Sequence, residues 1–248
     1  MDVRRAAFVL PNLFTLSSLF CGFFSIAQSF GAGSTDELHA AAIAILYGAF
    51  FDAFDGRVAR LTRTQTALGL ELDSLCDVVT FGVAPASLVY NWGLERLGLV
   101  GMLISFVWIA AGALRLARFN VLAQRAEAKP GKYIVGLPIP MAAMVIVALV
   151  VLANQVGGER YILGQGSLAL VVLGLSFLMV SRIRFRSFKD VKWRSRKTLG
   201  LILLLGVSST AVWVGLRGAH VFLFLLAIYI SLGIAETLLW RHGDNVNR

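Results

Sequence analysis

The sequence is poor in the residues on which soluble, disulfide-bonded and zinc-binding proteins depend. Charged residues make up 15% of it, whereas soluble domains use about 25%. Its two cysteines, Cys21 and Cys76, lie in apolar stretches, so we expect neither a disulfide framework nor a cysteine-based zinc site. Its three histidines are scattered without the spacing of metal ligands. Strand-like alternation is also missing from the sequence, which argues against an outer-membrane barrel.

Apolar residues dominate the sequence instead. They occupy 58% of the 248 positions, more than a soluble domain of this size can bury. Because a span needs about 20 apolar residues, we predict an all-α integral membrane protein with eight transmembrane helices. The first segment follows Arg4 and Arg5 as a signal peptide would, but it is long and lacks a cleavage site, so we interpret it as a span. The predicted spans are centred on residues 12–31, 37–61, 67–91, 97–120, 137–156, 163–181, 198–215 and 219–240.

The basic residues predict the orientation of these spans. All but three of the 23 lysines and arginines fall at the termini or in alternate loops, as the positive-inside rule requires of cytoplasmic segments. The exceptions are Arg96, Arg160 and Arg217. We therefore expect a cell-membrane protein with both termini in the cytoplasm, whose cytoplasmic face attracts anionic lipids. Beside two spans, the basic stretch at 183–197 is interpreted as a cytoplasmic loop, and no nucleic-acid partner is expected.

Four carboxylates stand at the cytoplasmic ends of the second and third predicted spans. They are Asp52, Asp55, Asp73 and Asp77. A charged side chain at mid-membrane costs roughly 2.5–3.5 kcal/mol on insertion scales, so some cation must compensate them. At about 100° per residue, the first two share a face of one helix, and the last two share a face of the next with Gly69, while Glu71 points away. The short polar turn at 62–66 lets the two helices pack antiparallel, with their carboxylates converging.

Convergent carboxylates predict a divalent-cation site. Oxygen-only ligands select a hard ion such as Mg²⁺, Mn²⁺ or Ca²⁺ over zinc or copper. Four carboxylates can hold two ions about 3.5–4 Å apart, the arrangement that assists displacement at phosphorus. Gly56 and Gly69 would allow the close approach of a bulky ligand, and Arg57 and Arg60 would donate to phosphate oxygens.

The residues alone leave three classes of function open. The acids could form the site of a metal-dependent enzyme, the ion path of a coupled transporter, or structural ion pairs with arginines. Two observations favour the enzyme. The acids crowd the cytoplasmic ends of the spans and not the midplane, where transport sites usually lie, and the sequence shows no internal repeat.

A longer pattern surrounds the four aspartates. Residues 52–77 read D-x2-D-G-x2-A-R-x8-G-x3-D-x3-D without a departure, which resembles the signature of the CDP-alcohol phosphatidyltransferase family. Pro11-Asn12 and three further segments resemble the branch of this family that uses serine as the acceptor. Those segments are 72–86, 115–120 and 136–140. The resemblance covers about residues 8–145, and beyond it only a hydrophobic pattern remains.

The resemblance implies transfer of the phosphatidyl group from CDP-diacylglycerol to the hydroxyl of L-serine, with release of CMP. It implies two divalent ions, Mg²⁺ or Mn²⁺, at the four aspartates, with Asp77 also acting as the general base. The residues expected to bind the CDP moiety are Asp52, Gly56, Arg57, Ala59, Arg60, Gly69 and Asp73. The serine carboxylate needs a cationic partner, and the residues expected to bind serine are Arg115, Arg118 and Asn120. Other acceptors, namely glycerol 3-phosphate, inositol phosphate or choline, remain open.

The expected organisation has three parts. A catalytic membrane domain covers 1–182, the basic loop covers 183–197, and two additional transmembrane helices with a short tail cover 198–248. Members of the family usually dimerise, so a homodimer is expected.

Overall fold

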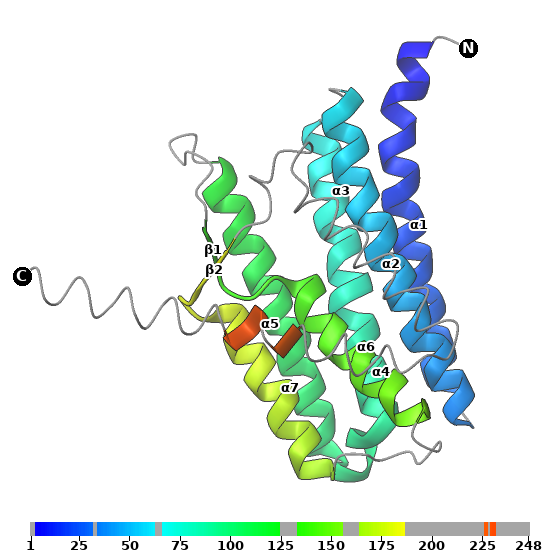
Figure 1. Cartoon of the computed structure of the whole chain (residues 1–248), viewed down its shortest axis with the longest axis vertical. Helices are drawn as coiled ribbons and strands as arrows, with labels where there is room; N and C mark the ends of the chain where they lie inside the picture. Colours follow the sequence, from blue (N-terminus) through cyan, green and yellow to red (C-terminus); the bar gives the residue numbers. More distant parts are fainter. Residues whose placement is uncertain are drawn as a thin grey trace, which may run out of the picture.

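Apolar helices build almost all of the part of the chain that the computed structural model describes, which is residues 3–31, 34–62, 66–124, 133–155, 164–186, 226–227 and 229–231. The longest are α1 (Val3–Gly31), α2 (Thr35–Thr62) and α5 (Leu99–Gln124). A third long run links α3 (Ala67–Asp77), η1 (Val78–Val83), α4 (Ala84–Val89), η2 (Tyr90–Leu94) and η3 (Glu95–Leu97). The shorter α6 (Ile139–Gln155) and α7 (Gln165–Val180) complete the bundle (Figure 1).

Four of these helical segments are long and apolar enough to cross a membrane. They are Pro11–Phe30, Thr35–Val58, Ala67–Leu97 and Leu99–Leu122. Large apolar side chains such as Phe20, Phe23 and Phe106 are exposed on their outer faces, as contact with lipid tails requires. The prediction of a helical membrane protein is confirmed at this level. The predicted span at 198–215 and most of the one at 219–240 lie outside the described residues.

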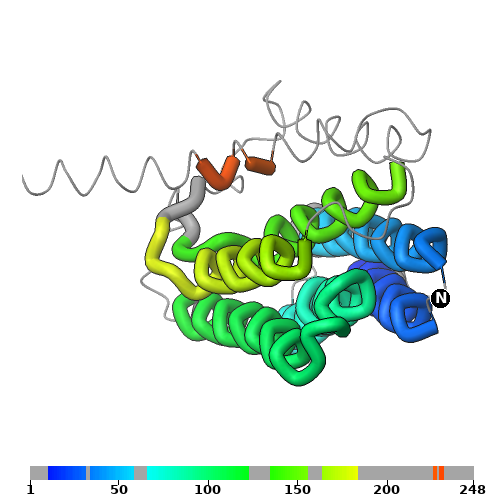
Figure 2. The backbone as a smooth tube through the Cα atoms, turned by 90° about the horizontal axis from the view of Figure 1, so that it is seen from below, coloured from blue at the N-terminus to red at the C-terminus, as the bar shows by residue number. Residues whose placement is uncertain are grey.

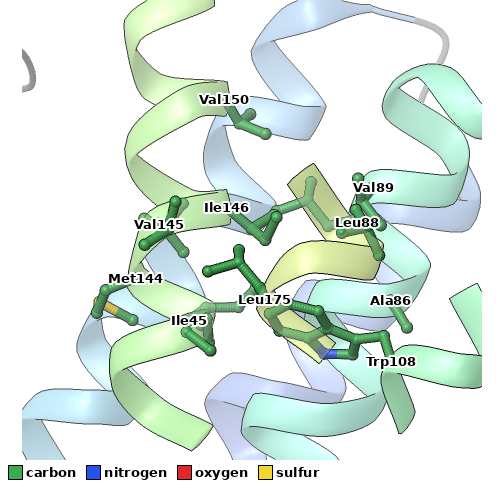
Figure 3. Close-up of a cluster of buried hydrophobic side chains, with 14 of the residues drawn as sticks. Ile45, Ala86, Leu88, Val89, Trp108, Met144, Val145, Ile146, Val150 and Leu175 are labelled. Atoms are coloured by element: carbon green, nitrogen blue, oxygen red, sulfur yellow. The ribbon is translucent and has the colours of Figure 1, made fainter. Parts of the chain in front are cut away.

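Pairwise packing of the helices builds the bundle, in which α6 lies along one side, next to α2 (Figure 2). Along its length α1 packs against α2, α2 packs against α6, and α5 packs against α7. Residues 142–148 of α6 are all buried, because a short helix that is apolar on every side is stable only among other helices. Figure 3 shows side chains from five helices meeting here, among them Ile45, Leu88, Trp108, Ile146 and Leu175.

The run from α3 to η3 contains two π-helical turns, and the first follows Asp77 directly. Pro85 has no N–H to offer the carbonyl oxygen of Phe81 four residues earlier. The indole Nε1 of the buried Trp108, on α5, donates to that oxygen at 3.2 Å instead. The hydroxyl of Thr80 donates to the carbonyl oxygen of Ser18 on α1 at 3.1 Å. Side chains from the third run and α5 therefore satisfy carbonyls that lie beside the irregular turn.

Two glycines let α1 and α2 approach η1 closely. A Cβ at Gly22 would lie 2.8 Å from the Cα of Thr80, and a Cβ at Gly48 would lie 2.6 Å from its Cγ2. Thr80 thus fills the space that the two absent side chains leave between the three elements. This junction lies about one to two helical turns from the aspartates. It fixes how far α1, α2 and the third run are shifted relative to one another along their axes.

Replacing Gly22 with alanine is expected to lower the thermal unfolding midpoint of the purified protein in detergent. The added Cβ collides with the backbone of Thr80, so α1 must move away from η1, and overpacking of this kind costs about 1–3 kcal/mol. Gly174→Ala on α7 is the matched control, since a Cβ there would meet no described atom within 4 Å. Equal midpoints for the two variants would contradict the close contact.

A two-stranded antiparallel ribbon departs from the all-helical prediction. In it β1 (Tyr133–Val135) pairs with β2 (Arg184–Arg186), and Ile134 faces Phe185. Gly136 follows β1 with a φ of 82°, and its N–H donates to the carbonyl oxygen of Ile183 at 2.8 Å. A Cβ at Gly136 would collide with the carbonyl oxygen of Met179. Strands of three residues are too short for alternation to show in a sequence, which is why the prediction missed them.

Candidate active site

Three of the four predicted aspartates meet where α2 and α3 face each other. One carboxylate oxygen from each of Asp52, Asp55 and Asp73 lies within 4.8 Å of the other two. Asp55 is 5% exposed, and the other two are half-buried. One turn of α2 separates the first pair, which places both on the same face of that helix. We call these three residues the acidic triad.

The start of α3 determines where Asp73 lies. Thr66 is the N-cap of α3, and its hydroxyl accepts a hydrogen bond from the N–H of Gly69 at 3.0 Å. Such a cap satisfies one of the N–H groups that the first turn of a helix leaves without a partner. From this fixed start, Asp73 follows about two turns into α3, opposite the aspartates of α2.

Asp77 lies outside the acidic triad. It is the last residue of α3, one turn beyond Asp73, which places it about 6 Å further along the helix at 1.5 Å per residue. Its carboxylate interacts electrostatically with those of Asp52, Asp73 and Asp55 and with the guanidinium group of Arg115 on α5. Along α3 the site therefore has two levels, with the acidic triad at the first and Asp77, which also interacts electrostatically with Arg115, at the second.

Of the three residues predicted to bind serine, Arg115 interacts electrostatically with Asp77. Its Nε is buried and has no hydrogen-bond partner among the described residues, and its Cζ lies 5.8 Å from the ring centroid of Phe119. Arg118 is exposed. The side-chain amide of Asn120 donates to the hydroxyl of Ser74 at 2.8 Å, which ties the end of α5 to α3 between Asp73 and Asp77.

The residues predicted to bind the CDP moiety lie around the acidic triad. A Cβ at Gly56 would meet no described atom within 4 Å, whereas one at Gly69 would lie 3.1 Å from the hydroxyl of Thr66. Arg57 is half-buried. Ala59 and Arg60 lie in the last turns of α2, and their side chains are outside the described part of the structure.

Three polar contacts of this site were not predicted from the sequence. Thr15 on α1 donates to Oδ2 of Asp55 at 2.8 Å. Ser74 receives the hydrogen bond from Asn120. Tyr229, which comes from the segment after residue 225, interacts electrostatically with Arg115. For Thr15 a signal was present, because Asn12, Thr15 and Ser18 are polar residues at helical spacing in an apolar segment.

The acidic triad fits a hard divalent cation. Its donors are all carboxylate oxygens, the ligands that Mg²⁺, Mn²⁺ and Ca²⁺ take. Oxygens that share one ion can lie up to twice the metal–oxygen distance apart, about 4.2 Å for Mg²⁺ and about 4.8 Å for Ca²⁺. The separations within the triad reach this range, so side-chain adjustments without helix movement suffice to bring three oxygens onto one ion.

The comparisons with known proteins agree with this chemistry. The family model described as CDP-alcohol phosphatidyltransferase matches residues 8–240. The chain is 39% identical over 227 residues to a CDP-diacylglycerol–serine O-phosphatidyltransferase of Helicobacter pylori strain J99, covering 90% of this chain and 89% of that protein. It is 36% identical to the Bacillus subtilis protein of the same name, covering 73% of this chain and 91% of that protein. It is also 34% identical to an archaetidylserine synthase of Methanothermobacter thermautotrophicus, covering 74% of this chain and 72% of that protein.

Proposed function

Because the chain belongs to the CDP-alcohol phosphatidyltransferase family, we propose that it transfers the phosphatidyl group of CDP-diacylglycerol to the hydroxyl of L-serine and releases CMP. The Helicobacter pylori and Bacillus subtilis relatives, which this chain matches over most of their length, are named for this serine transfer. The observation that carries the proposal is the meeting of Asp52, Asp55 and Asp73, all positions of the signature, at one point. Family membership also decides between the enzyme and the transporter that the residues alone left open, and the chain is a transferase.

The donor would bind at the first level of the site. Asp52, Asp55 and Asp73 would hold a divalent ion, Mg²⁺ or Mn²⁺, and Asp77 with the donor phosphates would complete the place for a second. A bound cation of this kind neutralises phosphate charge and orients the two phosphates. The open space beside Gly56 leaves room for the CDP moiety. Arg57 and Arg60 follow Asp55 by two and five residues, and their guanidinium groups would donate hydrogen bonds to the pyrophosphate.

Asp77 would act as the general base. A hydroxyl is a weak nucleophile until a positioned base takes its proton. The serine oxygen attacks the β-phosphorus, which carries the diacylglycerol, while its proton passes to the Asp77 carboxylate. The bond from this phosphorus to the bridging oxygen breaks, and CMP leaves with that oxygen. The place of Asp77 one turn beyond Asp73 and its electrostatic interaction with Arg115 support this role.

Arg115 would hold the serine carboxylate. Leaving a buried hydrogen-bonding group without a partner costs about 1–3 kcal/mol, and its buried Nε has none among the described residues. A serine whose carboxylate pairs with this guanidinium would place its hydroxyl towards Asp77. Arg118, one turn further and exposed, would add positive charge at the pocket mouth. Asn120 would act there through its hydrogen bond to Ser74.

Arg115→Gln is expected to raise the KM for L-serine by roughly 10- to 100-fold. The reason is that the variant loses a hydrogen bond to a charged group, which contributes about 1.5–3 kcal/mol. The KM for CDP-diacylglycerol should stay within a few-fold of the wild-type value. Steady-state CMP release at varied concentrations of each substrate measures both constants. Arg182→Gln, an exposed arginine beyond α7, is the control. If the KM for the donor rises as much as that for serine, Arg115 binds phosphate and not the acceptor.

The membrane arrangement follows from the same proposal. The N-terminal end of α1, the junction between α2 and α3 and the end of α5 lie at one end of the bundle, the upper end in Figure 1. Arg4 and Arg5 lie at the start of α1, and Arg57 and Arg118 lie near the corresponding ends of α2 and α5, which supports a cytoplasmic active site and cytoplasmic termini in the cell membrane. We also propose eight spans in all, arranged as a catalytic domain at 1–182, a basic loop at 183–197 that contacts anionic lipids, and two more helices within 198–248, in a homodimer.

The reaction can be tested directly with the purified protein in detergent. CMP release is measured with CDP-diacylglycerol and Mg²⁺ or Mn²⁺, comparing L-serine, glycerol 3-phosphate and myo-inositol 1-phosphate as acceptors. We expect release with L-serine alone, and none after chelation with EDTA. Release with a different acceptor would contradict the serine pocket but keep the donor site. No release with any acceptor from folded protein would overturn the proposed function.

A further inference from the structure

One hydroxyl on α1 reaches across to the acidic triad. Thr15 is 4% exposed, and its Oγ1 lies 2.8 Å from Oδ2 of Asp55 and 3.2 Å from the carbonyl oxygen of Pro11. A hydroxyl has one hydrogen to donate, and a bond to an ionised carboxylate is shorter and roughly twice as strong as one to a neutral oxygen. The shorter contact agrees with that preference, so the Thr15 hydroxyl donates its hydrogen bond to Oδ2 of Asp55.

Other buried hydroxyls of α1 are used differently. Ser29 is 1% exposed and donates to the carbonyl oxygen of Ser25, four residues back in its own helix, at 2.8 Å. That bond within the helix satisfies the hydroxyl without any contact to another element. Thr15 has the same kind of acceptor within reach in Pro11, and yet its closer partner is a carboxylate 40 positions away in the sequence. Burial alone therefore does not account for the contact.

We propose that Thr15 is a positioning residue for Asp55, and that α1 thereby takes part in cation binding although it contributes no acid to the triad. This inference rests on the proposed metal-dependent function. With Oδ2 held by the Thr15 hydroxyl, the carboxylate cannot rotate freely, and Asp55 keeps a fixed orientation towards the ion that it would share with Asp52 and Asp73. Carboxylates that bind metals are commonly oriented by such hydrogen bonds, and loss of the partner typically costs 10–100-fold in metal affinity or activity.

The packing of α1 gives Thr15 a fixed position from which to act. One turn beyond it, the carbonyl oxygen of Ser18 accepts the hydrogen bond from Thr80, and two turns beyond it Gly22 touches the backbone of the same residue so closely that no Cβ would fit. Sliding α1 along the bundle would break both contacts. The hydroxyl of Thr15 is therefore held at a constant height relative to α2 and α3.

The test measures Mn²⁺ binding to the full-length protein in detergent by electron paramagnetic resonance, without substrates. Thr15→Val keeps the shape of the side chain and removes the hydroxyl, and we expect the Kd for Mn²⁺ to rise roughly 10- to 100-fold. Thr15→Ser restores the hydroxyl, and its Kd should lie within a few-fold of the wild-type value. Ser29→Ala, which removes a buried hydroxyl from the same helix, should leave the Kd unchanged. The Mn²⁺ concentration for half-maximal CMP release should shift in parallel with the Kd, with the KM for serine unchanged.

Three results would overturn the inference. Wild-type affinity in Thr15→Val would show that Asp55 needs no support from α1. A Thr15→Ser protein as weak as Thr15→Val would assign the effect to packing of the methyl group. Failure of the wild-type protein to bind Mn²⁺ would remove the metal site itself, and with it the role of Thr15. This result is distinct from wild-type affinity in Thr15→Val, which would leave the metal site in place and remove only the role of Thr15. If Thr15→Val does not fold, Thr15→Ala replaces it with the same expected rise in Kd.

Discussion

Asp77→Asn is expected to lower serine-dependent CMP release by about 10²- to 10⁴-fold, the usual contribution of a positioned general base. Asparagine keeps the size of the side chain but cannot accept the proton of the serine hydroxyl. The loss should fall on kcat, because the substrates keep their binding groups at the triad and at Arg115. Glu71→Gln is the control, since Glu71 is an exposed acid on the same helix, and its replacement should leave kcat unchanged.

The same variant also separates the two roles predicted for Asp77. Because its carboxylate lies outside the acidic triad, Mn²⁺ binding in the absence of substrates should change far less than in a variant of the triad. Loss of Mn²⁺ binding in Asp77→Asn would make it a metal ligand of the substrate-free protein. A kcat within a few-fold of the wild-type value would remove it from the chemistry altogether.

The class of protein and the place of the site could be predicted because both depend on local sequence. Membrane spans are readable from apolar composition alone, and the described helices follow the predicted segments as far as residue 181. The faces of α2 and α3 were predictable from the helical period. Thus Asp52 and Asp55, three residues apart, lie together, and Glu71 is exposed as expected.

The height at which two helices meet depends on contacts distant in sequence, and these could not be predicted. The helical repeat places Asp73 and Asp77 on one face of α3, but one turn apart along its axis. Which of them meets α2 is determined by the junction at Thr80, where Gly22 and Gly48 admit η1. Four converging carboxylates were expected from the sequence. The structure brings oxygens of Asp52, Asp55 and Asp73 within 4.8 Å of one another, while Asp77 interacts electrostatically with all three and with Arg115. The hydrogen bond from Asn120 to Ser74 has the same origin, since it joins residues 46 positions apart.

Asp73→Asn is expected to abolish catalysis and to change stability in opposite directions with and without a divalent ion. Two unit charges within 4.8 Å of each other repel by at least about 3 kcal/mol at an effective dielectric constant of about 20. Removing one of three such charges relieves the repulsion, so in EDTA the thermal unfolding midpoint of the variant should exceed that of the wild-type protein. With saturating Mn²⁺ the order should reverse, because ligand binding stabilises the folded state and the variant has lost a ligand.

The activity of Asp73→Asn should fall by about 10³-fold or more, since a bound ion contributes several kcal/mol to charge stabilisation in the transition state and each 1.36 kcal/mol is about tenfold in rate. CMP release and unfolding midpoints with Mn²⁺ or EDTA measure the two effects. Asp36→Asn, an exposed acid in the first turn of α2, is the matched control and should show neither. A stabilisation by Mn²⁺ as large as that of the wild-type protein would contradict cation binding at the triad. A triad without a cation would have to carry its mutual repulsion uncompensated at the membrane boundary. The reversal of stability therefore tests directly why three acids are placed together there.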